Sequence, residues 1–328
     1  MNELSKDSRS GIKTELSGNA VVRQPIGEDA AGQRIDNFLV RWLKGVPKSH
    51  VYRILRSGEV RVNSGRIGPE YRLQLGDILR IPPIRVAKPQ VNRIFPQKAF
   101  IPDVIFEDEA LLVIDKPSGM AVHGGSGVSF GVIESLRLAR PNSPFLELVH
   151  RLDRETSGVL LLAKKRSALV AMHQQMQSGQ IEKRYFALVN GSWQDRKRVI
   201  DLPLVKWVTA SGERRVNVGA QGDRAITVVR LERYVGPYSL LDAELKTGRT
   251  HQIRVHLAHL GFPILGDEKY GLEELNKNVK KQDLKRMFLH ARRIVIKHPL
   301  NGNRLEFEAP LPESLQTFMR VAAVRSAS

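Results

Sequence analysis

One aspartate in this 328-residue chain stands in a setting that suits nucleophilic or proton-transfer chemistry. Asp153 lies in the sequence HRLDRETSG, residues 150–158, directly before the apolar run VLLLA. Arg151 and Arg154 flank it, and such cationic neighbours keep a carboxylate ionised at neutral pH. An ionised carboxylate has no proton to donate, so Asp153 is a candidate nucleophile or general base. A structural salt bridge in a turn is the equally simple alternative.

A second polar cluster is TGRTHQIRVH, residues 247–256. Ile253 and Leu257 mark the buried side of a predicted helix, which places Arg254 near the packed boundary, where an arginine needs an acidic partner. His251 and His256 are five residues apart, not the four that put two metal ligands on one helical face. No glutamate takes the zinc-protease position either. We therefore predict no metal site here.

Two further segments have polar or aromatic residues in suggestive patterns. In KRYFALV, residues 183–189, Tyr185 and Phe186 point to opposite faces if the segment is a strand, so one can be core while the other lines a cleft. Simple packing of both on a sheet is the alternative. The glycines of DKPSGMAVHGGSG, residues 115–127, match neither nucleotide-binding spacing. An NTPase or a dinucleotide-binding enzyme is therefore disfavoured, and we interpret that loop as an active-site wall or a contact to a phosphate backbone.

The elements that must position these residues are mostly strands. Apolar runs predict strands at Leu111–Asp115, Val159–Ala163, Tyr185–Val189, Ala225–Leu231 and Leu240–Leu245. Helical spacing predicts Ser167–Gln177 and His251–Leu260. Asn190-Gly191 is a hairpin-like turn, and no regular alternation of strand and helix is present. This favours an α+β domain over residues 103–320 on a mixed, mainly antiparallel sheet. Residues 276–286 are interpreted as a basic surface insertion.

A smaller unit is predicted before this domain, over residues 21–85. Helical spacing between Arg34 and Lys44 and again after Pro47 predicts two helices. Strands are predicted at Val60–Val62, Tyr71–Leu75 and Ile78–Ile81, the last two joined at Gly76-Asp77, which makes an αββ-type unit. The polar residues 1–20 are interpreted as a disordered tail, and the Pro-punctuated residues 86–102 as a linker.

The charge of the chain predicts a polyanionic partner. Lys+Arg 52 against Asp+Glu 34 gives a net charge of +18. Between residues 34 and 85, eleven Lys and Arg oppose four acidic residues, and closely spaced phosphates bind such a cluster by counterion release. A solvated helix face is the weaker alternative. The candidate residues for binding such a polyanion are Arg34, Arg41, Lys44, Lys48, Arg53, Arg56 and Arg61.

Composition excludes several classes of protein. The chain has no cysteine, which excludes disulfide scaffolds, thiolate metal sites and cysteine nucleophiles and fits a reducing compartment. The longest apolar run, Val159–Ala163, has the length of a strand, so we predict no membrane span. The first twenty residues lack the apolar core of a signal peptide. We expect a cytoplasmic protein, and the high net charge favours a monomer.

Taken together, these segments resemble two known families. The pattern QRIDNFLVRWLKGVPKSHVYRILRSGEVRVN…LGDILRI resembles the S4 RNA-binding domain over its whole length. The segments KPSGMAVHGGSG, HRLDRETSG, KRYFALV and TGRTHQIR resemble the pseudouridine synthases of the large-subunit ribosomal RNA type, from about residue 103 to 310. This resemblance implies that Asp153 is the catalytic aspartate, Tyr185 the active-site tyrosine and Arg254 the partner of the aspartate. It also implies that Arg151 fills the space of an extruded base.

The resemblance implies an isomerisation of uridine in 23S ribosomal RNA at more than one site. The N1–C1′ bond breaks, the uracil turns, and C5 joins C1′, so no atom is gained and no cofactor is needed. Asp153 would either attack C1′ or remove the C2′ proton, and both routes stay open. A non-catalytic ribosomal RNA-binding protein with an S4 module is one alternative. A hydrolase of glycosidic bonds is another, although such enzymes use two carboxylates.

Overall fold

The computed structural model describes most of the chain, in two compact units that divide at Ile94–Phe95. Each unit is described by itself. The described residues are 20–43, 45–84, 101–124, 130–143, 145–209 and 212–324. The predicted tail and linker therefore lie almost entirely outside the described residues, as does Lys44.

In its described residues, the first unit consists of two helices and a four-stranded antiparallel sheet. The helices are α1 (Ile35–Trp42) and α2 (Lys48–Arg56), and the strands are β1 (Val22–Pro25), β2 (Arg61–Val62), β3 (Gly65–Arg66) and β4 (Ile78–Ile81). Both predicted helices and the strand Ile78–Ile81 are confirmed. Ile35, Leu39, Val51 and Leu55 are buried in one core, since their spacing puts them on one face of each helix.

The predicted strand Tyr71–Leu75 is wrong. Its backbone pairs irregularly with the segment before α1: Ile35 N–H donates to Tyr71 O at 2.8 Å, and Leu73 N–H donates to Gln33 O at 2.9 Å. The turn itself is organised by Asp77, whose buried carboxylate accepts hydrogen bonds from Tyr71, Asn63 and the backbone. The neighbours of β4 are β1 and β2 instead.

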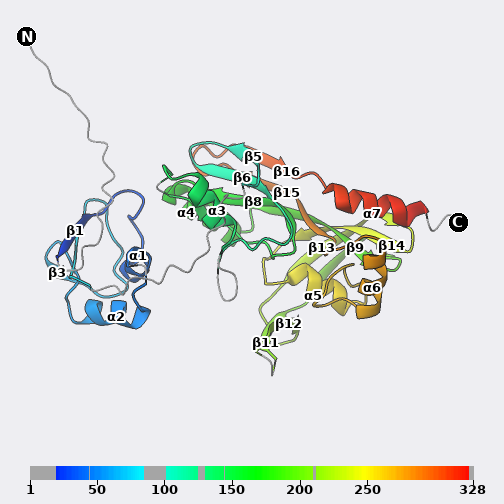
Figure 1. The fold of residues 1–328 in the computed structure, drawn as a ribbon, viewed down its shortest axis with the longest axis horizontal. Helices are drawn as coiled ribbons and strands as arrows, with labels where there is room; N and C mark the ends of the chain where they lie inside the picture. The colour runs from blue at the N-terminus through cyan, green and yellow to red at the C-terminus, as the bar shows by residue number, and fades with distance from the viewer. Residues whose placement is uncertain are drawn as a thin grey trace, which may run out of the picture. The chain divides into compact units, whose positions relative to one another are not determined.

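The second unit is built on a ten-stranded sheet (Figure 1). Its central order is β10-β13-β14-β9-β15-β8-β6-β5, with β16 on β15 and β7 on β8. Every pairing is antiparallel except that of β15 with β8, which confirms the predicted mixed, mainly antiparallel sheet among the described residues. The strands are β5 (Asp103–Glu107), β6 (Leu111–Lys116), β7 (Glu147–Leu148), β8 (Ser157–Ala163), β9 (Glu182–Asn190), β10 (Lys197–Asp201), β13 (Ile226–Val235), β14 (Tyr238–Leu245), β15 (Leu289–Lys297) and β16 (Arg304–Glu308).

Helices cover both faces of this sheet (Figure 1). They are α3 (Val132–Ala139), α4 (Arg166–Gln177), α5 (Gln252–His259), α6 (Glu273–Lys281) and α7 (Glu313–Val324). Side chains alternate along a strand, so Leu112 of β6 shares a core with Leu136 of α3, while Val113 shares another with Met172 of α4. Leu111–Ile114 of β6 and Val159–Ala163 of β8 are buried, continuous apolar runs because both faces of these strands are covered.

The five predicted strands and two predicted helices of this unit are confirmed, with changed ends. One other interpretation is wrong. Asn190-Gly191 does not form a hairpin, because β9 pairs with β14 and β15 and the chain continues to β10 at the sheet edge. Residues 276–286 are mostly exposed, as the interpretation of a basic surface segment requires, but Val279 and Leu284 anchor them in the main core.

A separate hairpin, β11 (Leu204–Val208) with β12 (Arg214–Val218), projects from the unit near α5 (Figure 1). Among the described residues, no helix is long and apolar enough to cross a bilayer.

Candidate active site

Asp153 lies in the loop that leads into β8. Thr156 N–H donates to Asp153 O at 3.1 Å, which closes a turn directly before the strand. Gly158 then sits where no side chain fits: its φ is +112°, and a Cβ would lie 2.2 Å from Ala291 O of β15. The parallel pairing of His290 with Ser157 follows from this close approach. The loop carrying Asp153 is therefore anchored by the strand pair β8–β15.

The loop after β6 braces the same turn from behind. The ammonium of Lys116, fully buried, donates to Pro117 O, Met120 O and Arg154 O at 2.7, 2.9 and 3.1 Å. Gly119 N–H also donates to Arg154 O at 2.8 Å. Burial lowers the pKa of Lys116 to about 7. The described residues of this loop, 115–124, do not line the cavity at Asp153, so its interpretation as an active-site wall is wrong for that part.

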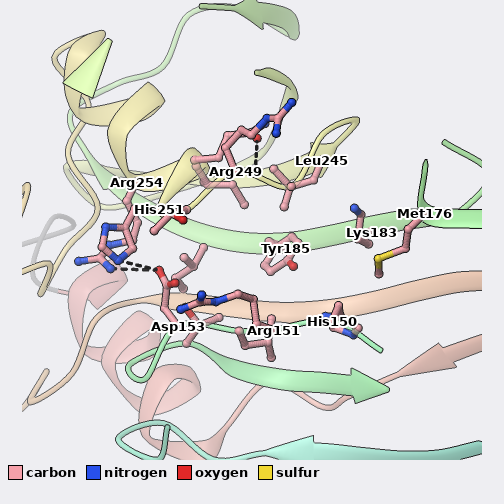
Figure 2. Close-up of a pocket in the computed structure, with 17 residues that line it drawn as sticks. His150, Arg151, Asp153, Met176, Lys183, Tyr185, Leu245, Arg249, His251 and Arg254 are labelled. Carbon is pink, nitrogen blue, oxygen red and sulfur yellow. Dashed lines mark hydrogen bonds and ion pairs between the residues drawn. The ribbon is translucent and has the colours of Figure 1, made fainter. Parts of the chain in front are cut away.

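Arg254 joins two carboxylates through one guanidinium, and Figure 2 shows its contact with Asp153. Its Nη1 donates to Asp153 Oδ2 at 3.1 Å, as the resemblance implied. Its Nε and Nη2 donate to the two oxygens of Asp267, each at 2.8 Å. Burial opposes the charge of Arg254, but the hydrogen bonds and fields of Asp267 and Asp153 raise its pKa above the usual value. The guanidinium is therefore permanently charged and fixed in orientation.

The second carboxylate was missed from sequence. Asp267 is buried and also accepts N–H groups of Lys269 and Tyr270 at 2.9 and 3.1 Å. Burial alone would raise the pKa of Asp267, but the contacts with Arg254 and these backbone groups hold it below its usual value. Asn276 of α6 brackets the segment, since its amide binds Gly266 N and Asp267 O. The need of Arg254 for an acid was the signal that could have prompted a search for this residue.

His251 adds a further polar group beside Asp153. Its backbone is left-handed, with φ 56°, a conformation that non-glycine residues adopt mainly where their surroundings enforce it. Its Nδ1 lies 2.7 Å from Tyr270 Oη and its Nε2 lies 3.9 Å from Asp153 Oδ2. Tyr270 also lies under the guanidinium of Arg254, with 5.1 Å to the ring centroid. His251 thus lines the cavity beside the carboxylate, and Tyr270 supports both His251 and Arg254.

Gln252 fixes the loop that precedes α5. Its side-chain oxygen accepts from Thr247 Oγ1 and Arg249 N–H, and its amide donates to Ile226 O and Thr227 Oγ1. His256 is a buried core histidine, whose ring nitrogens contact Thr227 Oγ1 and Leu202 O. No group of ligating side chains suited to a metal ion is found among the described residues.

Tyr185 and Phe186 lie on opposite faces of β9, as predicted. Tyr185 lines the cavity with Asp153, whereas Phe186 packs under Arg292, whose guanidinium carbon is 4.5 Å from the ring centroid. Burial, with the nearby charge of Asp153, raises the pKa of Tyr185. The phenol is therefore neutral at physiological pH. Its oxygen can accept a proton only if the hydroxyl proton is transferred to another group at the same time.

Asp153, Tyr185 and Arg254 line one cavity of about 270 Å³. It is large enough for a nucleoside-sized group (Figure 2). Arg151 lies in its wall and is exposed. Lys183, which sequence reasoning did not single out, also lines it, two residues before Tyr185 on the same face of β9. The structure thus brings Asp153, Tyr185, Arg254 and Arg151 together in one cavity.

The predicted RNA-binding residues lie on the first unit, with Lys44 outside the described residues. Most of them are exposed: Arg41, Lys48, Arg53, Arg56 and Arg61. Arg34 differs, because its guanidinium binds the buried carboxylate of Asp36 at 2.7 Å. That contact lowers the pKa of Asp36. Arg34 therefore has a structural partner within the fold.

Comparison with known families identifies both units. The S4 domain family matches residues 33–79, and the RNA pseudouridylate synthase family matches residues 110–259. A curated protein of Yersinia pestis, named ribosomal large subunit pseudouridine synthase C, is 52% identical over 295 residues, or 89% of this chain and 92% of the relative. The protein of the same name from Escherichia coli strain K12 is 50% identical over 311 residues, or 93% and 97% of the two chains.

Solved structures agree in fold. The human RNA pseudouridylate synthase domain containing 4 superposes with a TM-score of 0.55 at 24% sequence identity, over 68% of this chain and 93% of that one. Human RNA pseudouridylate synthase domain containing 1 gives a TM-score of 0.54 at 23% identity, over 70% and 97%. At these identities the likeness concerns the fold alone.

Proposed function

The chain belongs to the RNA pseudouridylate synthase family, and from that premise we propose that it converts uridines of 23S ribosomal RNA to pseudouridine at more than one site. The observation that carries this proposal is the convergence of Asp153, Arg254 and Tyr185 on one cavity. The name shared by the similar curated proteins supports the large-subunit RNA as substrate.

Asp153 is proposed to act on the ribose. When the N1–C1′ bond breaks, its electron pair leaves with the uracil, and the sugar becomes electron-deficient. The carboxylate either bonds to C1′ or removes the C2′ proton to leave a glycal. The uracil then turns and C5 bonds to C1′, the carboxylate is released or returns its proton, C5 loses its proton, and N1 gains one. The product is an isomer of the substrate, so no cofactor takes part.

Arg254 and Tyr185 support this chemistry in different ways. Arg254, held by Asp267, keeps the Asp153 carboxylate ionised and oriented toward the ribose. Tyr185 offers an aromatic face on which the uracil stacks. The target base must leave its helix, which costs a few kcal/mol, and the exposed guanidinium of Arg151 is suited to fill the vacated space.

The S4 unit is proposed to hold the structured RNA. Its exposed basic residues supply the charge that phosphates require. Because both units act on one RNA and no second copy is needed to complete the cavity, we expect a monomer that works in the cytoplasm on ribosomal RNA. A non-catalytic RNA-binding protein would explain the S4 unit but not the family match over residues 110–259.

Incubation with unmodified 23S rRNA transcripts tests this proposal. We expect carbodiimide-labelled mapping to detect new pseudouridines at defined positions, with no release of free uracil. Free uracil would instead identify a glycosidic hydrolase. Unmodified RNA that remains bound to the protein would identify a binding protein only.

A further inference from the structure

Lys183 is a cavity residue with no task in the chemistry described so far. It precedes Tyr185 by two positions on β9, and Figure 2 shows Tyr185 between Lys183 and Asp153 in this view of the cavity. Its Nζ lies 3.8 Å from the point where a Cβ on Gly248 would stand, so the ammonium rests against the loop before α5. Lys183 therefore lies at the other end of the cavity from the catalytic carboxylate.

This ammonium has no anionic or hydrogen-bonding partner among the described residues, although it is half-buried. Two other cations of the wall differ, since Arg254 binds two carboxylates and Arg249 donates to Arg224 O at 3.1 Å. Arg151 differs in another way, because it is exposed to solvent. The neighbouring His150 is neutral, because burial and the charge of Lys183 lower its pKa to about 4. A half-buried charge without a counterion is costly, and such groups in clefts commonly await a ligand.

The proposed reaction creates a suitable partner. Breaking the N1–C1′ bond leaves the electron pair on the uracil, and conjugation spreads that negative charge over N1, O2 and O4. If C1′ lies at Asp153 and the ring stacks on Tyr185, the edge opposite N1 points away from the carboxylate. That edge carries a carbonyl oxygen, and Lys183 lies at that end of the cavity.

We propose that Lys183 donates to this uracil carbonyl and stabilises the uracil anion while it is detached from the ribose. This inference rests on the proposed function. It assigns Lys183 as a catalytic residue, since the ammonium touches the group on which charge develops. Burial lowers the pKa of Lys183, which agrees with a site from which water is largely excluded.

The geometry of uracil lets one lysine serve both halves of the reaction. The ring has an approximate two-fold axis through N3 and C6, which exchanges N1 with C5 and O4 with O2. Turning the base about this axis brings C5 to the ribose and replaces O4 by O2 at the far edge. Lys183 therefore finds a carbonyl oxygen before and after the turn. A fixed donor at that point also keeps the free base from leaving the cavity.

Single-turnover kinetics on 23S rRNA fragments test the assignment with Lys183→Met and Lys183→Gln. We expect Lys183→Met to lower the rate of pseudouridine formation at saturating enzyme by about 10²-fold or more, the usual effect of removing such a donor. RNA affinity should not change. Lys183→Gln, which keeps a neutral donor, should recover part of the rate. Lys197→Met, on an exposed position of β10, is the control for loss of one charge.

A substrate with 5-fluorouridine at the target position separates a chemical role from a structural one. Fluorine withdraws charge from the uracil anion, so Lys183→Met should slow cleavage of this nucleotide by a smaller factor than cleavage of uridine. Equal factors for both substrates would overturn the assignment. So would weaker RNA binding with a salt slope lower by about 1 and an unchanged rate at saturation, which would identify a phosphate contact.

The two proposals fail in different ways in this experiment. If the wild-type protein forms no pseudouridine, the proposed function is wrong. If the wild-type protein is active and Lys183→Met matches it, only the assignment of Lys183 is wrong.

Discussion

Arg254 links the Asp153 carboxylate to the core of the protein. Two of its nitrogens are held by Asp267, which is 1% exposed, and only Nη1 remains for Asp153. An arginine with one acidic partner could turn about its long side chain, whereas this bidentate contact fixes its plane. The position of the Asp153 carboxylate therefore depends on a residue that does not reach the substrate.

Asp267→Asn tests this dependence. The change leaves a buried guanidinium with Asp153 as its sole carboxylate, so we expect the free energy of unfolding to fall by about 3 kcal/mol. The loss of orientation should lower kcat by about 10²-fold, as misplacement of a reacting group by 1 Å does. Denaturant unfolding and pseudouridine formation measure the two effects.

Glu268→Gln is the matched control, because it makes the same chemical change at the adjacent, exposed position. Its stability and rate should equal those of the wild type. An Asp267→Asn variant with wild-type kcat would show that Asp153 does not need the orientation that Arg254 provides.

Sequence reasoning could single out Asp153, Tyr185 and Arg254 as candidates because each stands in a dense local motif, and the structure brings all three to one cavity. It could not identify Asp267 or Lys183, because their importance depends on contacts made across the fold. Asp267 is thirteen residues from Arg254, in a loop, and the hydrogen bonds that join them have no sequence period. Lys183 stands out for two reasons: it lies two residues before Tyr185 on the same strand, and no anion surrounds its ammonium among the described residues. The second reason is visible only in the folded structure.

At the scale of elements, α1 and α2 each bury one face and leave the other charged. Val51 and Leu55 of α2 are in the core of the first unit, while Arg53 and Arg56 are exposed. No carboxylate contact is described for Arg56, so its charge is open to phosphate. A basic residue on such a face contributes affinity through counterion release.

Arg56→Gln should weaken binding of 23S rRNA fragments and reduce the slope of log K against log salt by about 1. The rate at saturating RNA should stay at the wild-type value, because the cavity is in the second unit. A filter-binding titration across salt concentrations measures this slope. Arg23→Gln, on the exposed side of β1, removes the same charge as a control. Equal slopes for Arg56→Gln and the wild type would remove Arg56 from the RNA interface.

Long periodic elements could be predicted from the sequence, whereas short or irregular ones could not. The apolar runs of β6 and β8 are unmistakable because both faces are buried. The two-residue strand β7 has no pattern to recognise, and α6 is too charged to reveal the buried Val279. The segment 71–75 alternates like a strand, but its hydrogen bonds serve the start of α1.

At the scale of the whole molecule, buried neutral histidines connect stability to pH. His290 is part of a chain in which Arg286 donates to Ser157 Oγ at 2.7 Å, Ser157 contacts Nδ1 of the histidine at 2.9 Å, and Nε2 contacts Ala309 O at 3.1 Å. The carbonyl can only accept, so Nε2 carries the proton. Burial lowers the pKa of His290 to about 4, as it does for His150.

Stability should therefore fall as the pH drops from about 6.5 to about 4. Between these pH values His150 and His290 are protonated in the unfolded chain but stay neutral in the folded protein. Above about pH 6.5 both histidines are neutral in both states. Each histidine contributes a slope of about 1.4 kcal/mol per pH unit. Denaturant unfolding at several pH values gives the slope of the free energy of unfolding against pH. For His290→Gln this slope should be smaller than that of the wild type by the contribution of one histidine. His259→Gln makes the same substitution at an exposed position and is the control for the exchange itself. An unaltered slope in His290→Gln would mean that His290 is charged in the folded protein.

A basic first segment and a later segment with the candidate site residues could be recognised from charge and composition. Between residues 34 and 85 eleven Lys and Arg oppose four acidic residues, and the motifs that carry the candidate site residues begin after residue 110. How the ten strands are ordered could not be predicted, because pairing joins segments far apart in the chain, such as β8 with β15. That pairing places the Asp153 loop beside the rest of the site.

Pseudouridine formation by Asp153→Asn is the most direct test of the account. Asparagine keeps the size of the side chain and a hydrogen bond to Arg254, but it has no negative charge to offer the ribose. We predict that this variant binds unmodified 23S rRNA with wild-type affinity and forms no pseudouridine under conditions in which the wild type completes the reaction. Pseudouridine formed by Asp153→Asn at the wild-type rate would contradict the account.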